Sequence, residues 1–84
     1  MPEHLPWILS QIGYSWTYGS SQIGIYRSGT VKSSFYEATE KTCQYACDHS
    51  PCDAYNWSSA TGFCVLVHDD TALVPISSWR SDAR

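Results

Sequence analysis

The sequence predicts an α+β fold in which one helix packs on a curved antiparallel sheet and disulfides staple the two together. Three observations support this prediction. The chain is short, with 84 residues; four cysteines fall within positions 43–64; and alternating segments flank a single helical segment. A domain of ~60–85 residues buries only roughly 60% of its unfolded surface, so it usually needs covalent reinforcement. We therefore expect one domain spanning residues 1–84.

The predicted helix covers residues 39–48. Thr39 is a good N-cap, and an acidic residue follows it in the first turn, where the helix dipole favours negative charge. Residues 50–51, Ser-Pro, end the helix because proline disfavours helical geometry at the residue before it. Ser34 and Glu37 could form an earlier capping box, which leaves a more N-terminal start as an alternative.

The remaining segments show the alternation or the short apolar runs of β-strands. Residues 5–18 alternate in places, most clearly at residues 14–18, where three large aromatic side chains fall on one face and small hydroxyl side chains on the other. We expect further strands at residues 23–26, 52–57 and 63–67, and a loop at residues 68–70. A last edge strand is expected at residues 73–76, because its proline lacks a donor for the ladder.

The strand at residues 52–57 has two faces of different size. Alternation places Cys52, Ala54 and Asn56 on one face, and Tyr55 and Trp57 on the other. We expect the helix to pack on the small-residue face.

The four cysteines allow three pairings. A bridge between Cys43 and Cys47 within the helix is disfavoured, because Cβ atoms four residues apart lie ~5–6 Å apart and a relaxed disulfide needs ~3.8 Å. The chain turns back after the helix, which brings Cys47 to Cys52 and leaves Cys43 for Cys64. The outer bridge closes a loop of roughly 20 residues, which is worth about 3 kcal/mol in the chain-entropy model.

A structural zinc site is the alternative use of these cysteines. Cys43 and Cys47 could ligate the metal, with His49, His68 or the other two cysteines completing a tetrahedron. The usual C-x2-C spacing of such sites does not occur, so we predict disulfides and no metal.

Three runs of sequence resemble the PAN/apple domain: T-E-K-T-C-Q-Y-A-C, P-C-D-A-Y-N-W and G-F-C-V-L, within about residues 36–67. The resemblance implies a helix cradled against a curved antiparallel sheet, with the two nested disulfides given above. No cysteines are placed to form the third disulfide of apple domains proper, so the chain is closer to the two-disulfide PAN form. The resemblance also implies an adhesion or recognition module that binds proteins or carbohydrates without catalysis.

Composition argues against several other classes. The net charge is −3 and the five basic residues are spread along the chain, so no basic patch for nucleic acid is evident. No apolar stretch is long enough to cross a membrane. Residues 68–70, His-Asp-Asp, are adjacent in sequence, whereas catalytic groups must converge from different parts of a fold. We predict no enzyme activity and no cofactor.

The aromatic side chains are the candidate ligand-binding residues. Large aromatics usually fill the core, but partly exposed Trp, Tyr and Arg side chains also dominate binding surfaces. Asn56 begins an N-glycosylation sequon, although we expect its side chain to face the helix, where a glycan would not fit. The ligand-binding candidates are Trp16, Tyr18, Trp57, Trp79 and Arg80.

These observations predict a secreted, non-catalytic recognition module for a protein partner or a carbohydrate, with a protein slightly preferred. The even cysteine count favours an oxidising, extracellular setting, although residues 1–12 do not form a signal peptide. The alternative is a free-standing secreted peptide, such as a pheromone, toxin or effector, on the same scaffold. The apolar residues 73–76 also leave self-association as a homodimer open.

Overall fold

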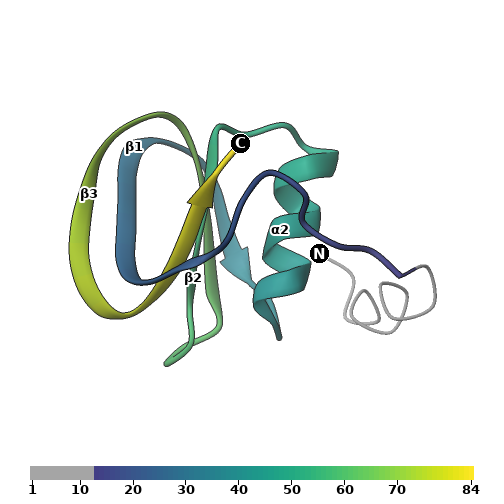
Figure 1. Ribbon diagram of the computed structural model, residues 1–84, viewed down its shortest axis with the longest axis horizontal. Coiled ribbons are helices and arrows are strands. Elements are labelled where there is room, and N and C mark those ends of the chain that lie inside the picture. The colour runs from purple at the N-terminus through teal and green to yellow at the C-terminus, as the bar shows by residue number, and fades with distance from the viewer. Residues whose placement is uncertain (1–12) are drawn as a thin grey trace.

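The computed structural model describes residues 13–84. In these residues, strand β1 (Gln22–Tyr36) is followed by one helix, α2 (Glu40–His49). Strands β2 (Ala54–Ser58) and β3 (Phe63–Ala83) follow the helix and form a hairpin (Figure 1). The predicted α+β class is confirmed.

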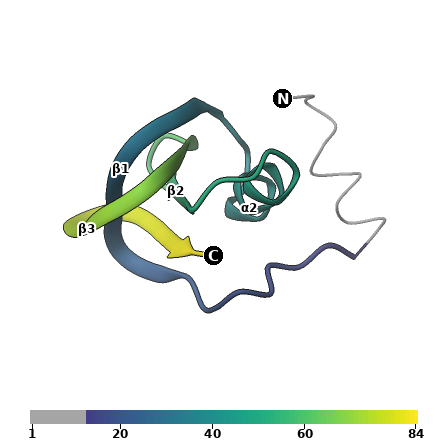
Figure 2. The ribbon, with the colours of Figure 1, turned by 90° about the horizontal axis from the view of Figure 1, so that it is seen from above.

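Strands β1 and β3 pair antiparallel from Gln22 opposite Ser81 to Tyr36 opposite Phe63, although residues 76–79 of β3 have no partner on β1. The register shifts at three places along β1, at residues 23–25, 28–30 and 31–33. Extra residues at a register shift bend a strand and increase its twist. The two strands therefore curl together into a hoop (Figure 1), and α2 lies at the open side of the arc that β1 draws in Figure 2.

Strand β2 closes the hoop because it lies between the two ends of β3. As β2 advances from Ala54 to Trp57, its partners at one edge run from Val67 back to Cys64. At the other edge its partners run from Ala83 back to Arg80. Partner numbers that fall in this way mean that both pairings are antiparallel. The predicted curved antiparallel sheet is confirmed, and it closes on itself around β2.

One bend of the hoop requires glycine at position 29. A Cβ atom on Gly29 would lie 2.5 Å from the backbone oxygen of His68, so no larger residue fits without a backbone shift. On the facing strand, Asp69 has a φ of 53°, in the left-handed region that aspartate tolerates better than most residues. The prediction of a loop at residues 68–70 was wrong, because these residues form an irregular bend within β3.

Helix α2 begins where the sequence predicts. Thr39 adopts extended backbone geometry, and its hydroxyl accepts a hydrogen bond from the backbone N–H of Thr42 at 3.2 Å. This side-chain cap satisfies one of the free N–H groups of the first turn. The backbone N–H of Ser50 donates to the carbonyl oxygen of Ala46 and ends the helix. The alternative start at a Ser34–Glu37 capping box was wrong, because Ser34 lies within β1.

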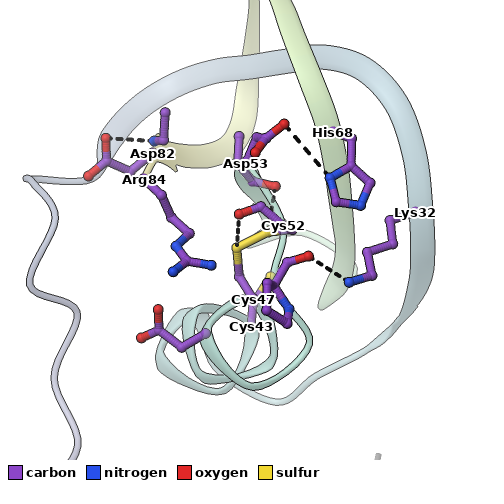
Figure 3. The surroundings of a disulfide bond; sticks show 12 residues. Lys32, Cys43, Cys47, Cys52, Asp53, His68, Asp82 and Arg84 are labelled. Atoms are coloured by element: carbon purple, nitrogen blue, oxygen red, sulfur yellow. Dashed lines mark hydrogen bonds and ion pairs between the residues drawn. A yellow bond between two sulfur atoms is a disulfide. The ribbon is translucent and has the colours of Figure 1, made fainter.

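All four cysteines form disulfides, Cys43 with Cys64 and Cys47 with Cys52. This is the pairing that the sequence favours. The first bridge joins α2 to β3, and the second joins the end of α2 to the turn that leads into β2 (Figure 3). Each cysteine sulfur is bonded to another sulfur in one of these two disulfides. The alternative zinc site would therefore have no thiolate ligands.

The side of β2 that faces the helix is the opposite of the predicted one. Tyr55 packs with the helix cysteines in one core cluster, and Trp57 lies against that cluster. Ala54 instead packs in a second cluster with Val65 and Val67, lined by Tyr26 and Trp79. The physical reason is that Cys64, the cross-strand partner of Trp57, is bonded to the helix, so Trp57 and Tyr55 face the helix as well. Asn56 also lies on this side, not on the helix side as expected.

Residues 13–18 do not form the predicted strand. Among the described residues, no backbone–backbone hydrogen bond joins this segment to the sheet. An extended segment becomes a strand only where a neighbouring strand supplies partners, and here its contacts are made by side chains. The part of that prediction on residues 5–12 lies outside the described residues.

The other predicted strands exist, although the strands are longer than expected. Residues 23–26 lie within β1, and residues 63–67 and 73–76 both lie within β3. Between residues 13 and 84, the ten-residue α2 falls well short of the length needed to cross a membrane.

Candidate recognition surface

Residues 13–18, called the arm below, bring alternating aromatic side chains against the helix side of the sheet. The first is Tyr14, whose hydroxyl donates to Asp48 Oδ2 on α2 at 2.5 Å. Its ring meets the ring of Tyr45 edge-on, with centroids 5.2 Å apart. Burial raises the pKa of Tyr14, and the hydrogen bond to the Asp48 carboxylate raises it further. The phenol therefore remains a donor at neutral pH.

The second and third aromatics of the arm lie near the C-terminal end of β3. The indole N–H of Trp16 donates to Asp82 Oδ2 at 3.0 Å, and its ring lies 5.0 Å from the ring of Tyr55. The ring of Tyr18 lies 4.9 Å from that of Trp16. The Arg84 guanidinium donates to the Tyr18 hydroxyl oxygen at 3.2 Å and sits 5.0 Å from the ring centroid. Tyr18 remains 48% exposed.

Trp57 and Arg80 face each other across β2 and β3 and therefore share the helix side. The indole N–H of Trp57 donates to the carbonyl oxygen of Glu37 at 3.1 Å, which fixes the ring. The Arg80 guanidinium lies 3.8 Å from Glu40 Oε1, and its side chain is 42% exposed. An exposed pair at this distance contributes about 0–1 kcal/mol, so the guanidinium is available to a partner.

A buried tyrosine holds this pair and the arm together. The Tyr55 hydroxyl donates to Glu40 Oε2 at 2.6 Å and accepts from Gln44 Nε2 at 2.9 Å. Burial raises the pKa of Tyr55, and the bond to the Glu40 carboxylate raises it further. The Tyr55 ring then supports Trp16, while Glu40 positions Arg80.

Four of the five predicted ligand-binding residues thus project from one side of the sheet. The cross-strand pair Trp57–Arg80 is next to the pair Tyr55–Asp82, on which the arm is anchored. We call these four residues the recognition surface: Trp16, Tyr18, Trp57 and Arg80. The fifth candidate, Trp79, lies on the other side, where its ring meets that of Tyr26 at 4.9 Å.

Comparison with known protein families finds a match to the PAN domain over residues 20–82. The match covers most of the chain and includes the helix, the hairpin and both disulfides. This chain belongs to the PAN domain family. Searches of curated proteins and of solved structures found no match. PAN domains are generally non-catalytic modules that bind proteins or carbohydrates, and they are typically extracellular.

Three residues that hold the arm in the PAN domain are not among the residues predicted from the sequence. Asp82 and Arg84 anchor the arm, and Tyr55 supports it. A signal for this arrangement was present in the sequence. A short turn at residues 58–62 sets Trp57 opposite Cys64, and a Cys64 bonded to the helix puts Trp57 on the helix side. Counting by twos along the same strand then places Tyr55 there as well.

The histidine and two aspartates of the bend in β3 do not converge on one point. His68 Nδ1 lies 3.7 Å from Asp53 Oδ2 (Figure 3), whereas Asp70 lies 3.6 Å from the Arg27 guanidinium. The Asp69 backbone N–H also donates to the Asp53 carboxylate, at 2.7 Å. These contacts hold the bend to the turn before β2. The three side chains thus stabilise the fold and do not form a common site.

The sequon residue Asn56 is fully buried inside the hoop of the PAN domain. The oxygen and the nitrogen of its amide group each form a hydrogen bond with the backbone of Arg27, at 2.6 and 2.9 Å. A glycan on the Asn56 nitrogen would have to displace one of these bonds and open the hoop.

Proposed function

We propose that this PAN domain is a secreted, non-catalytic recognition module that binds a protein partner through the recognition surface. The proposal rests on one observation above the others. Trp16, Tyr18, Trp57 and Arg80 gather on one side of the sheet, and these residue types provide most of the binding energy at protein interfaces.

The chemistry of the surface favours a protein over a carbohydrate. Arg80 has a loose ion pair with Glu40 and is half exposed, so its guanidinium can form bidentate bonds with a partner carboxylate. The polar groups nearest the rings, Asp82 and Glu40, already accept hydrogen bonds from Trp16 and Tyr55. A sugar needs free acceptors and donors beside the ring on which it stacks.

The test is a binding screen in two arms. The immobilised domain is incubated with the extracellular protein fraction of the native source, and the same domain is applied to a glycan array. We expect a retained protein whose affinity falls at least ~10-fold in Arg80→Ala and in Tyr18→Ala, because exposed anchors are lost without unfolding.

The controls remove similar groups from other places. Lys32→Ala removes a positive charge from β1, and Tyr36→Ser removes a tyrosine that is 72% exposed. Both controls should bind like the wild type. A ligand found only on the glycan array would select the carbohydrate alternative. If neither arm yields a ligand, or if the ligand is insensitive to both surface variants, the proposed surface is wrong.

A further inference from the structure

The arm precedes the residues that match the PAN family, and side chains alone hold it to the rest of the domain. The family match begins at residue 20, whereas the arm ends at residue 18. Among the described residues, the arm makes no backbone–backbone hydrogen bond with the rest of the chain. Its contacts are those of Tyr14 with Asp48, Trp16 with Asp82 and Tyr18 with Arg84. The arm is therefore bound as a short peptide ligand would be.

The side chains beneath the arm define what kind of segment fits there. Asp48 and Asp82 each accept a hydrogen bond from the tip of an aromatic side chain. The rings of Tyr45 and Tyr55 supply edge-on partners 5.2 and 5.0 Å away. The site thus fits an extended segment with a tyrosine or tryptophan at every second residue. The chain contains such a segment itself, so a second copy carries a complete occupant.

The connection between the arm and β1 has the properties of a hinge. Residues 19–21 are Gly-Ser-Ser, and the first two are exposed. A Cβ atom on Gly19 would lie 2.8 Å from Asp82 Oδ2, so the chain passes close to the anchor of Trp16 before it enters the sheet. A terminal element on a short hinge can be exchanged between two copies with the same contacts in each.

We propose that the arm exchanges between two copies of this chain, so that the arm of each copy binds α2 and β3 of the other. The exchange itself does not depend on the proposed function; only its consequence for ligand binding rests on that proposal. In the exchanged dimer, each recognition surface takes Trp16 and Tyr18 from the other copy and keeps its own Trp57 and Arg80. Two such surfaces on one dimer would bind a partner bivalently.

Hinge length sets the balance between the two forms. A short flexible linker gives the arm an effective concentration in the millimolar range for its own binding site. Exchange in the wild-type chain therefore competes with the intramolecular form at protein concentrations near or above ~1 mM. A hinge too short to fold back removes the intramolecular form and leaves the exchanged one.

The experiment is sedimentation equilibrium on the full chain with Ser20 and Ser21 deleted. At about 100 μM we expect twice the mass of one shortened chain, whereas the full-length chain should show its monomer mass of 9.4 kDa. The matched control inserts Gly-Ser after Ser20 and should remain monomeric. Adding Trp16→Ala to the shortened chain should return it to a monomer, because the dimer depends on the arm.

Two results would overturn the exchange. One is a shortened chain that is folded by near-ultraviolet circular dichroism yet monomeric, and the other is a dimer that survives Trp16→Ala. If the shortened chain does not fold, full-length Trp16→Ala is titrated with a synthetic peptide of residues 13–19. Saturable binding that is lost in the Trp-to-Ala peptide supports exchange, and absence of binding contradicts it. Ligand binding by the monomer is unaffected in either case, so the two proposals fail separately.

Discussion

The side-chain amide of Asn56 and the backbone of Arg27 form a closed pair of hydrogen bonds across the hoop. The Arg27 N–H donates to Oδ1 at 2.6 Å, and Nδ2 donates to the Arg27 carbonyl oxygen at 2.9 Å. Asn56 lies on β2 and Arg27 on β1, two strands that share no ladder. The amide thus supplies the partners that a neighbouring strand would otherwise supply.

Replacing Asn56 should therefore destabilise the fold. Asn56→Ala leaves a backbone N–H and a carbonyl without partners in a buried site, and each costs about 1–3 kcal/mol. We expect the free energy of unfolding to fall by roughly 2–4 kcal/mol in urea titrations. The control, Ser34→Ala at an exposed position of β1, should change it by less than ~0.5 kcal/mol. A similarly small effect for Asn56→Ala would show that the pair does not hold the hoop closed.

Gly29→Ala should disrupt the bend between β1 and β3. Its Cβ would meet the His68 oxygen at 2.5 Å and the Asp69 oxygen at 3.0 Å, and both are backbone atoms that cannot rotate away. Overpacking of this kind costs about 1–3 kcal/mol or more.

Gly24→Ala is the matched comparison for this variant. Gly24 has a φ of +81°, but a Cβ there meets no atom within 4 Å, so only the backbone penalty of ~1–2 kcal/mol applies. Thermal unfolding of both variants should show the larger loss for Gly29→Ala. Equal losses would mean that the bend can shift to admit a methyl group.

Glu37 should make stability depend on pH. Burial raises the pKa of Glu37 above its ordinary 4.5, although a hydrogen bond with Thr42 opposes the shift. A carboxyl with a higher pKa in the folded state binds its proton more tightly there, so its contribution favours folding at low pH. That contribution is lost as pH rises from 4.5 through the folded pKa.

The measurement compares Glu37→Gln with the wild type in urea at pH 4 and pH 7. Glutamine cannot ionise, so the variant should gain stability relative to the wild type on going from pH 4 to pH 7. The exposed variant Asp69→Asn serves as the control and should follow the wild type. If the free energies of unfolding of Glu37→Gln and wild type differ by the same amount at both pH values, Glu37 is not the cause of the pH dependence.

Local signals in the sequence predicted the helix, its Thr39 cap, the hairpin and the antiparallel sheet. Each depends on residues that are close in the chain, such as the proline after the helix or the turn at residues 58–62. The disulfide pairs followed from the same local geometry, because all four cysteines lie within positions 43–64.

The long-range arrangement could not be predicted in this way. Alternation shows which residues share a face, but it does not show which face of β2 meets the helix. The bend at residues 68–70 looks like a loop because it is polar, yet the facing strand keeps it in the sheet. The arm has the alternation of a strand, but the site it occupies offers side chains instead of a backbone edge. The recognition surface depends on two of these long-range facts, the face of β2 that meets the helix and the position of the arm.

Both covalent bridges lie within residues 43–64, and the part of β3 that pairs with the second edge of β2, residues 79–83, comes later in the chain. During synthesis the four cysteines can therefore be oxidised before this part of β3 exists. That later segment carries no disulfide, so it is held to β2 by hydrogen bonds and packing alone. Oxidation thus secures the helix and the first half of the hairpin, while the second contact of β3 with β2 depends on noncovalent interactions.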